Sequence, residues 1–275
     1  MVSTALNLPG PVACARLREL GASVAKVEPP SGDPFESYCG SWYRRLHEGL
    51  DVRRLDLKSA GGRGALEALL DGSDLLVTAQ RPSALARLGL DPGSLAARHP
   101  RLCHVAITGH PAPEEEVAGH DLTYLAMHGL VTPPNLPATL FADMAGAERA
   151  VTTALALVIR RDRSGRAESL AAPLEDAARA LAQPLREGLT RRSGLLGGGL
   201  AGYNVYAARE GWIAVAALEP HFARRLAQAF ALPELTVEGL REKFSSQTDM
   251  QWERWARERD LPIVAVRILS TQPAP

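Results

Sequence analysis

Three side chains in this sequence, at positions 120, 143 and 219, are of types that could move protons. His120 precedes an apolar, helix-forming stretch in GHDLTYLAMHG, and an unperturbed imidazole titrates near neutral pH. Asp143 follows an apolar run in LFADMAG, where a carboxylate could accept a proton or attack an acyl group. Glu219 ends the apolar stretch before Pro220. Each of the three also fits a helix start, with Asp121 as the N-cap after His120, and from the residues alone this structural interpretation is favoured.

A second set of residues could hold phosphate groups. Four arginines lie on connections that follow predicted strands, and the planar guanidinium suits phosphate oxygens; they are Arg53, Arg54, Arg81 and Arg87. Gly198, in the run of three glycines at 197–199, could let the backbone approach a ligand closely. The run lacks the preceding strand, the lysine and the hydroxyl residue of a phosphate-binding P-loop, so a flexible hinge explains it equally well.

The elements that must position these side chains follow an alternating pattern in the first half of the chain. Short β-branched runs alternate with amphipathic helical stretches, which indicates an α/β fold with a Rossmann-like parallel sheet. Ligands of such sheets bind beyond the carboxyl ends of the strands, where the loop 109–118 would deliver His120. We predict strands at 22–28, 74–79 and 102–108, and helices at 12–21, 60–71, 83–98, 144–161 and 175–185.

The second half predicts a smaller α+β domain. The glycine-rich segment 190–202 is the predicted linker, and after it YNVYAAREGWIAVAAL reads as two strands joined by a turn at 209–211. Helices are expected at 219–231, 236–244 and 248–259. The predicted organisation is therefore a large domain over 1–189, the linker 190–202, a small domain over 203–265 and a C-terminal tail over 266–275.

Composition and charge exclude several classes of function. Lys and Arg together number 31, as do Asp and Glu, so no overall field attracts nucleic acid or a membrane surface. The three cysteines have neither disulfide nor metal-ligand spacing, and we predict no metal site. No leader and no apolar run of about 20 residues is visible, which favours a cytoplasmic protein.

Six stretches of the chain form one ordered set: LNLPGPVACARLRELGASVAKVEPPSGDP, VRRLDLKSAGGRGALEALLDGSDLLVTAQRPSALARLGL, HPRLCHVAITGH, GHDLTYLAMHGL, LFADMAGAERAVTTALALVIRRDRSGR and GYNVYAAREGWIAVAALEPHF. In this order and spacing they resemble the class III CoA-transferase family (CaiB/BaiF type), which includes the α-methylacyl-CoA racemases. The resemblance implies a large Rossmann-like domain, a small domain and a homodimer of two interlocked chains. It also implies coenzyme A as a substrate, with no permanently bound cofactor.

Roles for the site residues follow from this resemblance. In the transferases the matching aspartate, here Asp143, attacks the thioester and carries the acyl group before CoA passes to an acceptor acid. In the racemases it moves the α-proton together with the histidine matching His120, beside a glutamate matching Glu219. Arg81 and Arg87 match positions that contact the nucleotide. We therefore expect CoA transfer between small carboxylic acids, with α-methylacyl-CoA racemisation as one alternative and a non-catalytic CoA-binding homologue as another.

Overall fold

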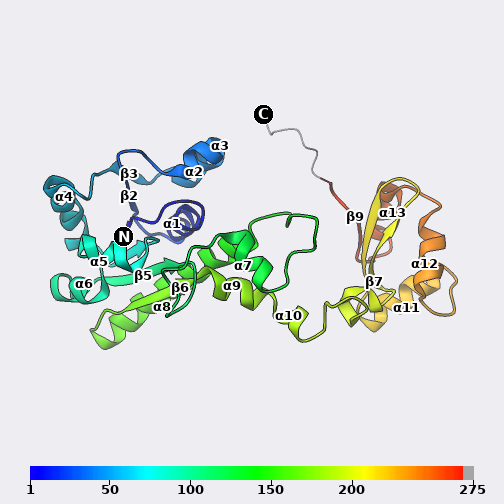
Figure 1. Ribbon diagram of the computed structural model, residues 1–275. Helices are drawn as coiled ribbons and strands as arrows, with labels where there is room; N and C mark the ends of the chain where they lie inside the picture. The colour runs from blue at the N-terminus through cyan, green and yellow to red at the C-terminus, as the bar shows by residue number, and fades with distance from the viewer. Residues whose placement is uncertain (269–275) are drawn as a thin grey trace. The chain divides into compact units, whose positions relative to one another are not determined.

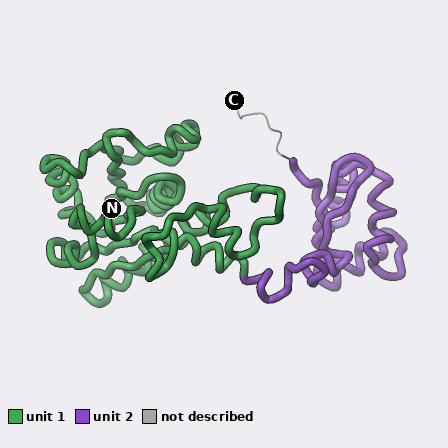
Figure 2. The backbone as a smooth tube through the Cα atoms, viewed as in Figure 1, with its two compact units in different colours: residues 1–182 green, residues 183–275 purple. Residues whose placement is uncertain are grey.

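The structure is a computed structural model that describes residues 1–268 (Figure 1). The chain forms two compact units, residues 1–182 and 183–275, shown in different colours in Figure 2. Residues 269–275, which make up most of the predicted tail, lie outside the described residues.

The first unit is built on a six-stranded sheet in which every neighbouring pair is parallel. The strand order is β3-β2-β1-β4-β5-β6, so the order reverses between β1 and β4, where α/β sheets bind ligands. The predicted Rossmann-like sheet is confirmed. The strands are β1 (Val2–Ser3), β2 (Ala25–Glu28), β3 (Asp51–Arg54), β4 (Leu75–Thr78), β5 (Cys103–Thr108) and β6 (Ser169–Pro173).

Helices pack on both faces of this sheet, because successive apolar side chains of β4 point to opposite faces and both faces must be covered. Leu75 and Val77 belong to one hydrophobic core, whereas Leu76 between them belongs to the core on the other face. The predicted helix 60–71 is confirmed as α4. The helices of the unit are α1 (Pro9–Glu19), α2 (Pro34–Tyr38), α3 (Gly40–His47), α4 (Ala60–Asp71), α5 (Pro82–Leu88), α6 (Pro92–Arg98), α7 (Asp121–Met127), α8 (Phe141–Ser164) and α9 (Leu174–Leu181).

Helix α8 is the longest element, and its position matters because its first turn carries Asp143. Its buried face contains small residues such as Gly146, Ala147 and Ala150, which let α1 and α9 pack closely against it. At its far end the buried guanidinium of Arg161 donates to Asp74 at 2.9 Å and to Asp162. The helix therefore holds its first turn on a rigid frame.

The second unit has a three-stranded antiparallel sheet in the order β7-β8-β9. The predicted hairpin is confirmed, since Ala208 N–H donates to the Gly211 carbonyl across the turn and Gly211 has φ +79°. The third strand, β9, was not predicted. The elements are β7 (Tyr203–Ala207), β8 (Trp212–Ala216), β9 (Ile263–Ala265), α10 (Gln183–Arg186), the kinked segment Leu195–Gly199, α11 (Pro220–Ala229), α12 (Val237–Phe244) and α13 (Asp249–Arg257).

Aromatic side chains form the core of the second unit. Phe230, Phe244 and Trp252 pack edge to face at centroid distances of 5.3–5.5 Å, and Trp255 stacks on Phe230 at 4.9 Å. Among the described residues of both units, no helix is long and apolar enough to cross a membrane.

Candidate active site

A cavity of about 330 Å³ opens at the carboxyl end of the parallel sheet in the first unit. It lies beyond the ends of β1, β4, β5 and β6, where an open α/β sheet is expected to bind its ligand. Both His120 and Asp143 line it. The other lining residues are Leu6, Asn7, Pro9, Ala79, Gln80, Arg81, Ile107, Thr108, Gly109, Glu115, Val117, Ala118, Gly119, Tyr124 and Leu174.

His120 stands at the N-cap of α7 with its side chain exposed at the cavity. Its backbone makes the helix start: its N–H donates to Thr123 Oγ1 at 3.0 Å, and its carbonyl accepts from Thr123 and Tyr124 N–H. The backbone of His120 thus forms the helix start, and its exposed ring lies at the cavity.

Asp143 lines the same cavity from the first turn of α8. Its carboxylate has no hydrogen-bond partner among the described residues. Burial, with a smaller contribution from the charge of Asp121, raises the pKa of Asp143 to about 7. A carboxyl group with such a pKa exists in both protonation states near neutral pH and suits proton transfer.

The prediction that Asp121 caps its own helix is wrong. Asp121 is the first residue of α7 and is buried, and its Oδ1 accepts a hydrogen bond from the backbone N–H of Asp143 at 3.0 Å. It therefore caps α8, whose N-cap residue Leu140 offers no side-chain acceptor. Burial raises the pKa of Asp121 as well. This contact joins the segments that carry His120 and Asp143.

Tyr124 is a cavity residue that the sequence analysis missed. Its side chain is fully buried, and burial followed by the charge of Asp143 raises the pKa of its hydroxyl to about 12. Two glycines make room for it: a Cβ on Gly109 would lie 2.5 Å from the Tyr124 hydroxyl, and one on Gly119 would overlap the ring. Tyr124 follows His120 by one helical turn, and this spacing could have indicated a shared face.

Replacing Gly119 with alanine is therefore expected to destabilise the protein by about 1–3 kcal/mol, because Tyr124 must shift and its buried surroundings are closely packed. Urea denaturation measures the change. Gly64→Ala is the matched control: a Cβ at this exposed position of α4 meets no atom within 4 Å. That variant should gain roughly 0.5–1 kcal/mol in helix stability. Equal effects of the two variants would refute the proposed packing.

The family of the chain follows from its match to known proteins. The model of CoA-transferase family III matches residues 1–269. The chain belongs to this family. Human alpha-methylacyl-CoA racemase is 29% identical over 246 residues, which cover 82% of this chain and 62% of that protein. Succinyl-CoA–D-citramalate CoA-transferase of Chloroflexus aurantiacus is 28% identical over 255 residues, covering 84% and 63%.

Solved structures with the same fold support the architecture of this family III chain. A crystal structure of a hypothetical protein from Mycobacterium tuberculosis matches with a TM-score of 0.82 at 22% identity. The match covers 97% of this chain and 82% of the other. The chain spans about three fifths of the length of the two curated relatives named above.

The arginines proposed to bind CoA are not gathered at one place. Arg81 is the N-cap residue of α5 and lines the cavity. Arg87 is exposed in the last turn of the same helix and does not line it. Arg53 and Arg54 lie within β3, an edge strand whose four residues are all exposed, so their placement on a connection is wrong. They form ion pairs with Asp51 at 2.7 Å and with Glu36 at 3.2 Å.

Two of the predicted site residues belong to the second unit. Glu219 is exposed at the N-cap of α11, with extended backbone and no side-chain capping bond. Gly198 lies in the segment before β7 and has a left-handed φ of +98°. Their roles in a family III site remain predictions.

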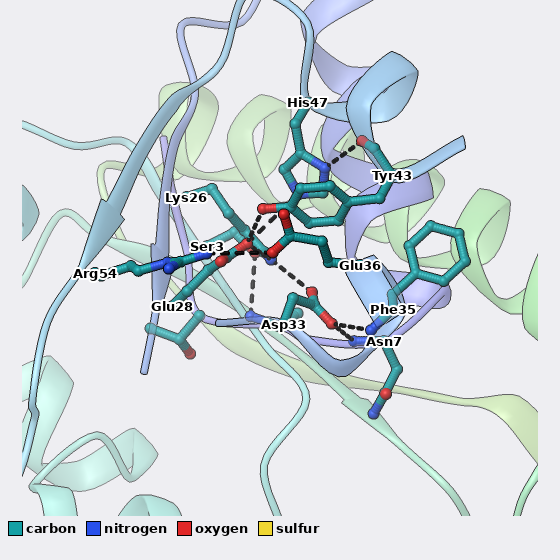
Figure 3. A network of polar contacts seen from close by, with 12 residues as sticks. Ser3, Asn7, Lys26, Glu28, Asp33, Phe35, Glu36, Tyr43, His47 and Arg54 are labelled. Carbon is teal, nitrogen blue, oxygen red and sulfur yellow. Dashed lines mark hydrogen bonds and ion pairs between the residues drawn. The ribbon is translucent and has the colours of Figure 1, made fainter. Parts of the chain in front are cut away.

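A second polar cluster in this family III chain is buried among β2, α2 and α3 (Figure 3). Lys26, Glu28 and Asp33 are fully buried or nearly so, and Lys26 Nζ lies 3.2 Å from Glu28 Oε1 and 2.9 Å from Asp33 Oδ2. Tyr43 donates to Glu28 at 2.9 Å. Glu28 and Asp33 with His47 have the donor types of a metal site, but the ammonium group of Lys26 already supplies the cation there.

Proposed function

We propose that the chain is an enzyme that moves the α-proton of an acyl-CoA thioester. This proposal agrees with the name of one similar protein, human alpha-methylacyl-CoA racemase. The supporting observation is the pair His120 and Asp143 on one cavity, the first exposed there and the second with a pKa of about 7. CoA transfer needs only the carboxylate. Proton transfer uses both groups.

The reaction would proceed in two proton transfers. Neutral His120 takes the α-proton from one face, which leaves an enolate thioester, and protonated Asp143 then gives a proton to the other face. The reverse direction uses ionised Asp143 as the base and the imidazolium of His120 as the acid. Asp143 lies in the first turn of α8, where the positive end of the helix dipole stabilises negative charge.

CoA transfer is the second candidate, and Asp143 supports it. A carboxylate that burial has stripped of water is a strong nucleophile toward a thioester. Its oxygen would bond to the acyl carbon and expel the CoA thiolate, giving a mixed anhydride. The thiolate would then attack the Asp143 carbonyl and release the first acid, and the acceptor carboxylate would take over CoA in the reverse sequence.

The surroundings of the site are part of the proposal. Arg81 would pair with a phosphate of CoA, because it lines the same cavity and a guanidinium suits phosphate oxygens. A small carboxylic acid is the expected second substrate if CoA is transferred. The pairing of Glu219 with His120, a homodimer and a cytoplasmic location remain predictions.

Exchange of the α-proton tests the proposal. Incubated with a 2-methylacyl-CoA in deuterated water, the wild-type protein should remove the α-proton signal in the NMR spectrum. His120→Ala should slow this exchange by about 10²–10⁴-fold, because it removes one of the two proton carriers. His99→Gln is the control, since His99 contacts Glu67 and Asp71 and does not line the cavity.

The other outcomes separate the alternatives. Absence of exchange, together with an acyl intermediate that hydroxylamine traps at Asp143, would replace racemisation by CoA transfer. Binding of CoA without either reaction would leave a non-catalytic CoA-binding protein. No binding at all would refute every acyl-CoA function.

A further inference from the structure

A carboxylate outside the cavity is held between two buried histidines. Glu175, in the first turn of α9, has its Oε2 2.6 Å from Nδ1 of His110 and its Oε1 3.4 Å from Nε2 of His128. The side chains of His110, His128 and Glu175 are 5%, 8% and 15% exposed. His110 follows β5 and His128 is the C-cap residue of α7, so three separate segments converge here.

A second carboxylate completes the group. The ligand atoms of His110, Glu114 and Glu175 lie within 4.8 Å of one another, and Glu114 comes from the loop 109–118. Within the described part of the chain, no lysine or arginine forms an ion pair with Glu114 or Glu175. The cluster around Lys26 differs, because an ammonium group compensates its carboxylates. Glu175, whose side chain is 15% exposed, has among residues 1–268 only the two histidine rings as partners that could carry a positive charge, and a carboxylate so far removed from water favours a nearby cation.

We propose that His110, Glu114 and Glu175 bind a divalent transition-metal ion of the zinc class. One imidazole nitrogen and two carboxylate oxygens leave a fourth tetrahedral position for water. The imidazole disfavours Ca²⁺ and Mg²⁺, which take oxygen ligands. His128 would contact the second oxygen of Glu175 and orient it, as partners of metal-ligating carboxylates do. The spacing of the cysteines predicts no metal site, and the convergence of His110, Glu114 and Glu175 depends on the fold.

Such an ion would fix the loop that leads to His120. The loop begins beside His110, carries Glu114 and then supplies Glu115, Val117 and Ala118 to the cavity lining. Glu116 already ties it to α5 by accepting from the Ser83 N–H at 2.7 Å. The ion therefore acts as a structural clamp outside the cavity, and it would stabilise the loop without taking part in the acyl-CoA reaction.

Metal binding by the full chain, prepared without a histidine tag and freed of metal by a chelator, tests this proposal. Titration with Co²⁺ should give visible d–d absorption bands that saturate at a single equivalent. Calorimetry with Zn²⁺ should show the same stoichiometry, and Mg²⁺ and Ca²⁺ should not compete. Zn²⁺ should also raise the thermal unfolding midpoint, because it binds the folded state.

Variants locate the ion. Glu114→Gln and His110→Gln should each weaken Zn²⁺ binding on the order of tenfold or more, since each removes a ligand. Glu114 is exposed on a loop, so this variant decides the matter even where His110→Gln fails to fold. His99→Gln, in the His99, Glu67 and Asp71 cluster, should bind Zn²⁺ as the wild type does. No binding by the wild type, or equal binding by Glu114→Gln, would overturn the proposal.

Discussion

Replacing Asp143 with asparagine is expected to lower the rate of α-proton exchange by about 10²–10⁴-fold. The amide keeps the shape of the side chain but can neither take nor give the proton. Asp143 lines the cavity, and its carboxylate makes no hydrogen bond to a residue between 1 and 268, so little else in the structure should change. The NMR exchange assay measures the loss.

The same substitution is expected to stabilise the folded protein at and above neutral pH. Burial raises the pKa of Asp143 to about 7, so the folded state binds this proton more tightly than the unfolded chain does. The raised pKa of Asp143 therefore contributes to the free energy of unfolding. This contribution is complete below about pH 4 and is lost as the pH rises through about 7. Asparagine carries no charge, and the variant should gain at most ~4 kcal/mol over the wild type at pH 8, with partial exposure reducing that figure.

Thermal unfolding of both proteins across this pH range measures the effect. The two midpoints should coincide near pH 4 and diverge toward pH 8. Glu148→Gln is the matched control on the same helix: Glu148 is 59% exposed and lies 3.8 Å from Arg16, so its change should stay within about 1 kcal/mol at every pH. An asparagine variant that exchanges the α-proton at the wild-type rate would exclude Asp143 from the reaction.

Local sequence patterns were sufficient to predict the strands and helices around this site. The apolar run at 74–79 predicts β4 within a residue at each end, and the helix at 60–71 is found as predicted. The family motifs led to His120 and Asp143, and the structure places both on one cavity. These features depend on periodicity or on short motifs, which a single sequence displays.

Contacts between residues far apart in the chain could not be predicted from the sequence. Asp121 caps a helix that begins 20 residues later, whereas a local rule assigns it to its own helix. His110 and Glu175 are 65 residues apart, and only the sheet brings them together. Strand β3 was missed because its four residues are polar or exposed at a sheet edge and show no buried run. Lys26 lies in an apolar strand, and no local pattern indicates that Glu28 and Asp33 are its ion-pair partners.

Replacing Lys26 with methionine is expected to destabilise the first unit by about 3–5 kcal/mol, because it leaves the carboxylates of Glu28 and Asp33 buried without their cation. Methionine has a similar unbranched chain, so lost volume contributes little. The loss of stability should also affect the residues that line the cavity. Asp33 Oδ1 accepts from the N–H of Asn7 at 2.9 Å, and Asn7 lines the cavity with a left-handed φ of +61° (Figure 3).

Urea denaturation measures the loss of stability of the chain. Hydrogen exchange of peptides from β2 and α3, which both belong to the first unit, then assigns the loss to that unit. Arg53→Met is the matched control, because Arg53 is 48% exposed and its pair with Asp51 is solvated. It should change stability by at most about 1 kcal/mol. A loss for Lys26→Met no larger than that of the control would mean that Glu28 and Asp33 are not held as charged groups. Unchanged exchange at Asn7 would separate this cluster from the cavity.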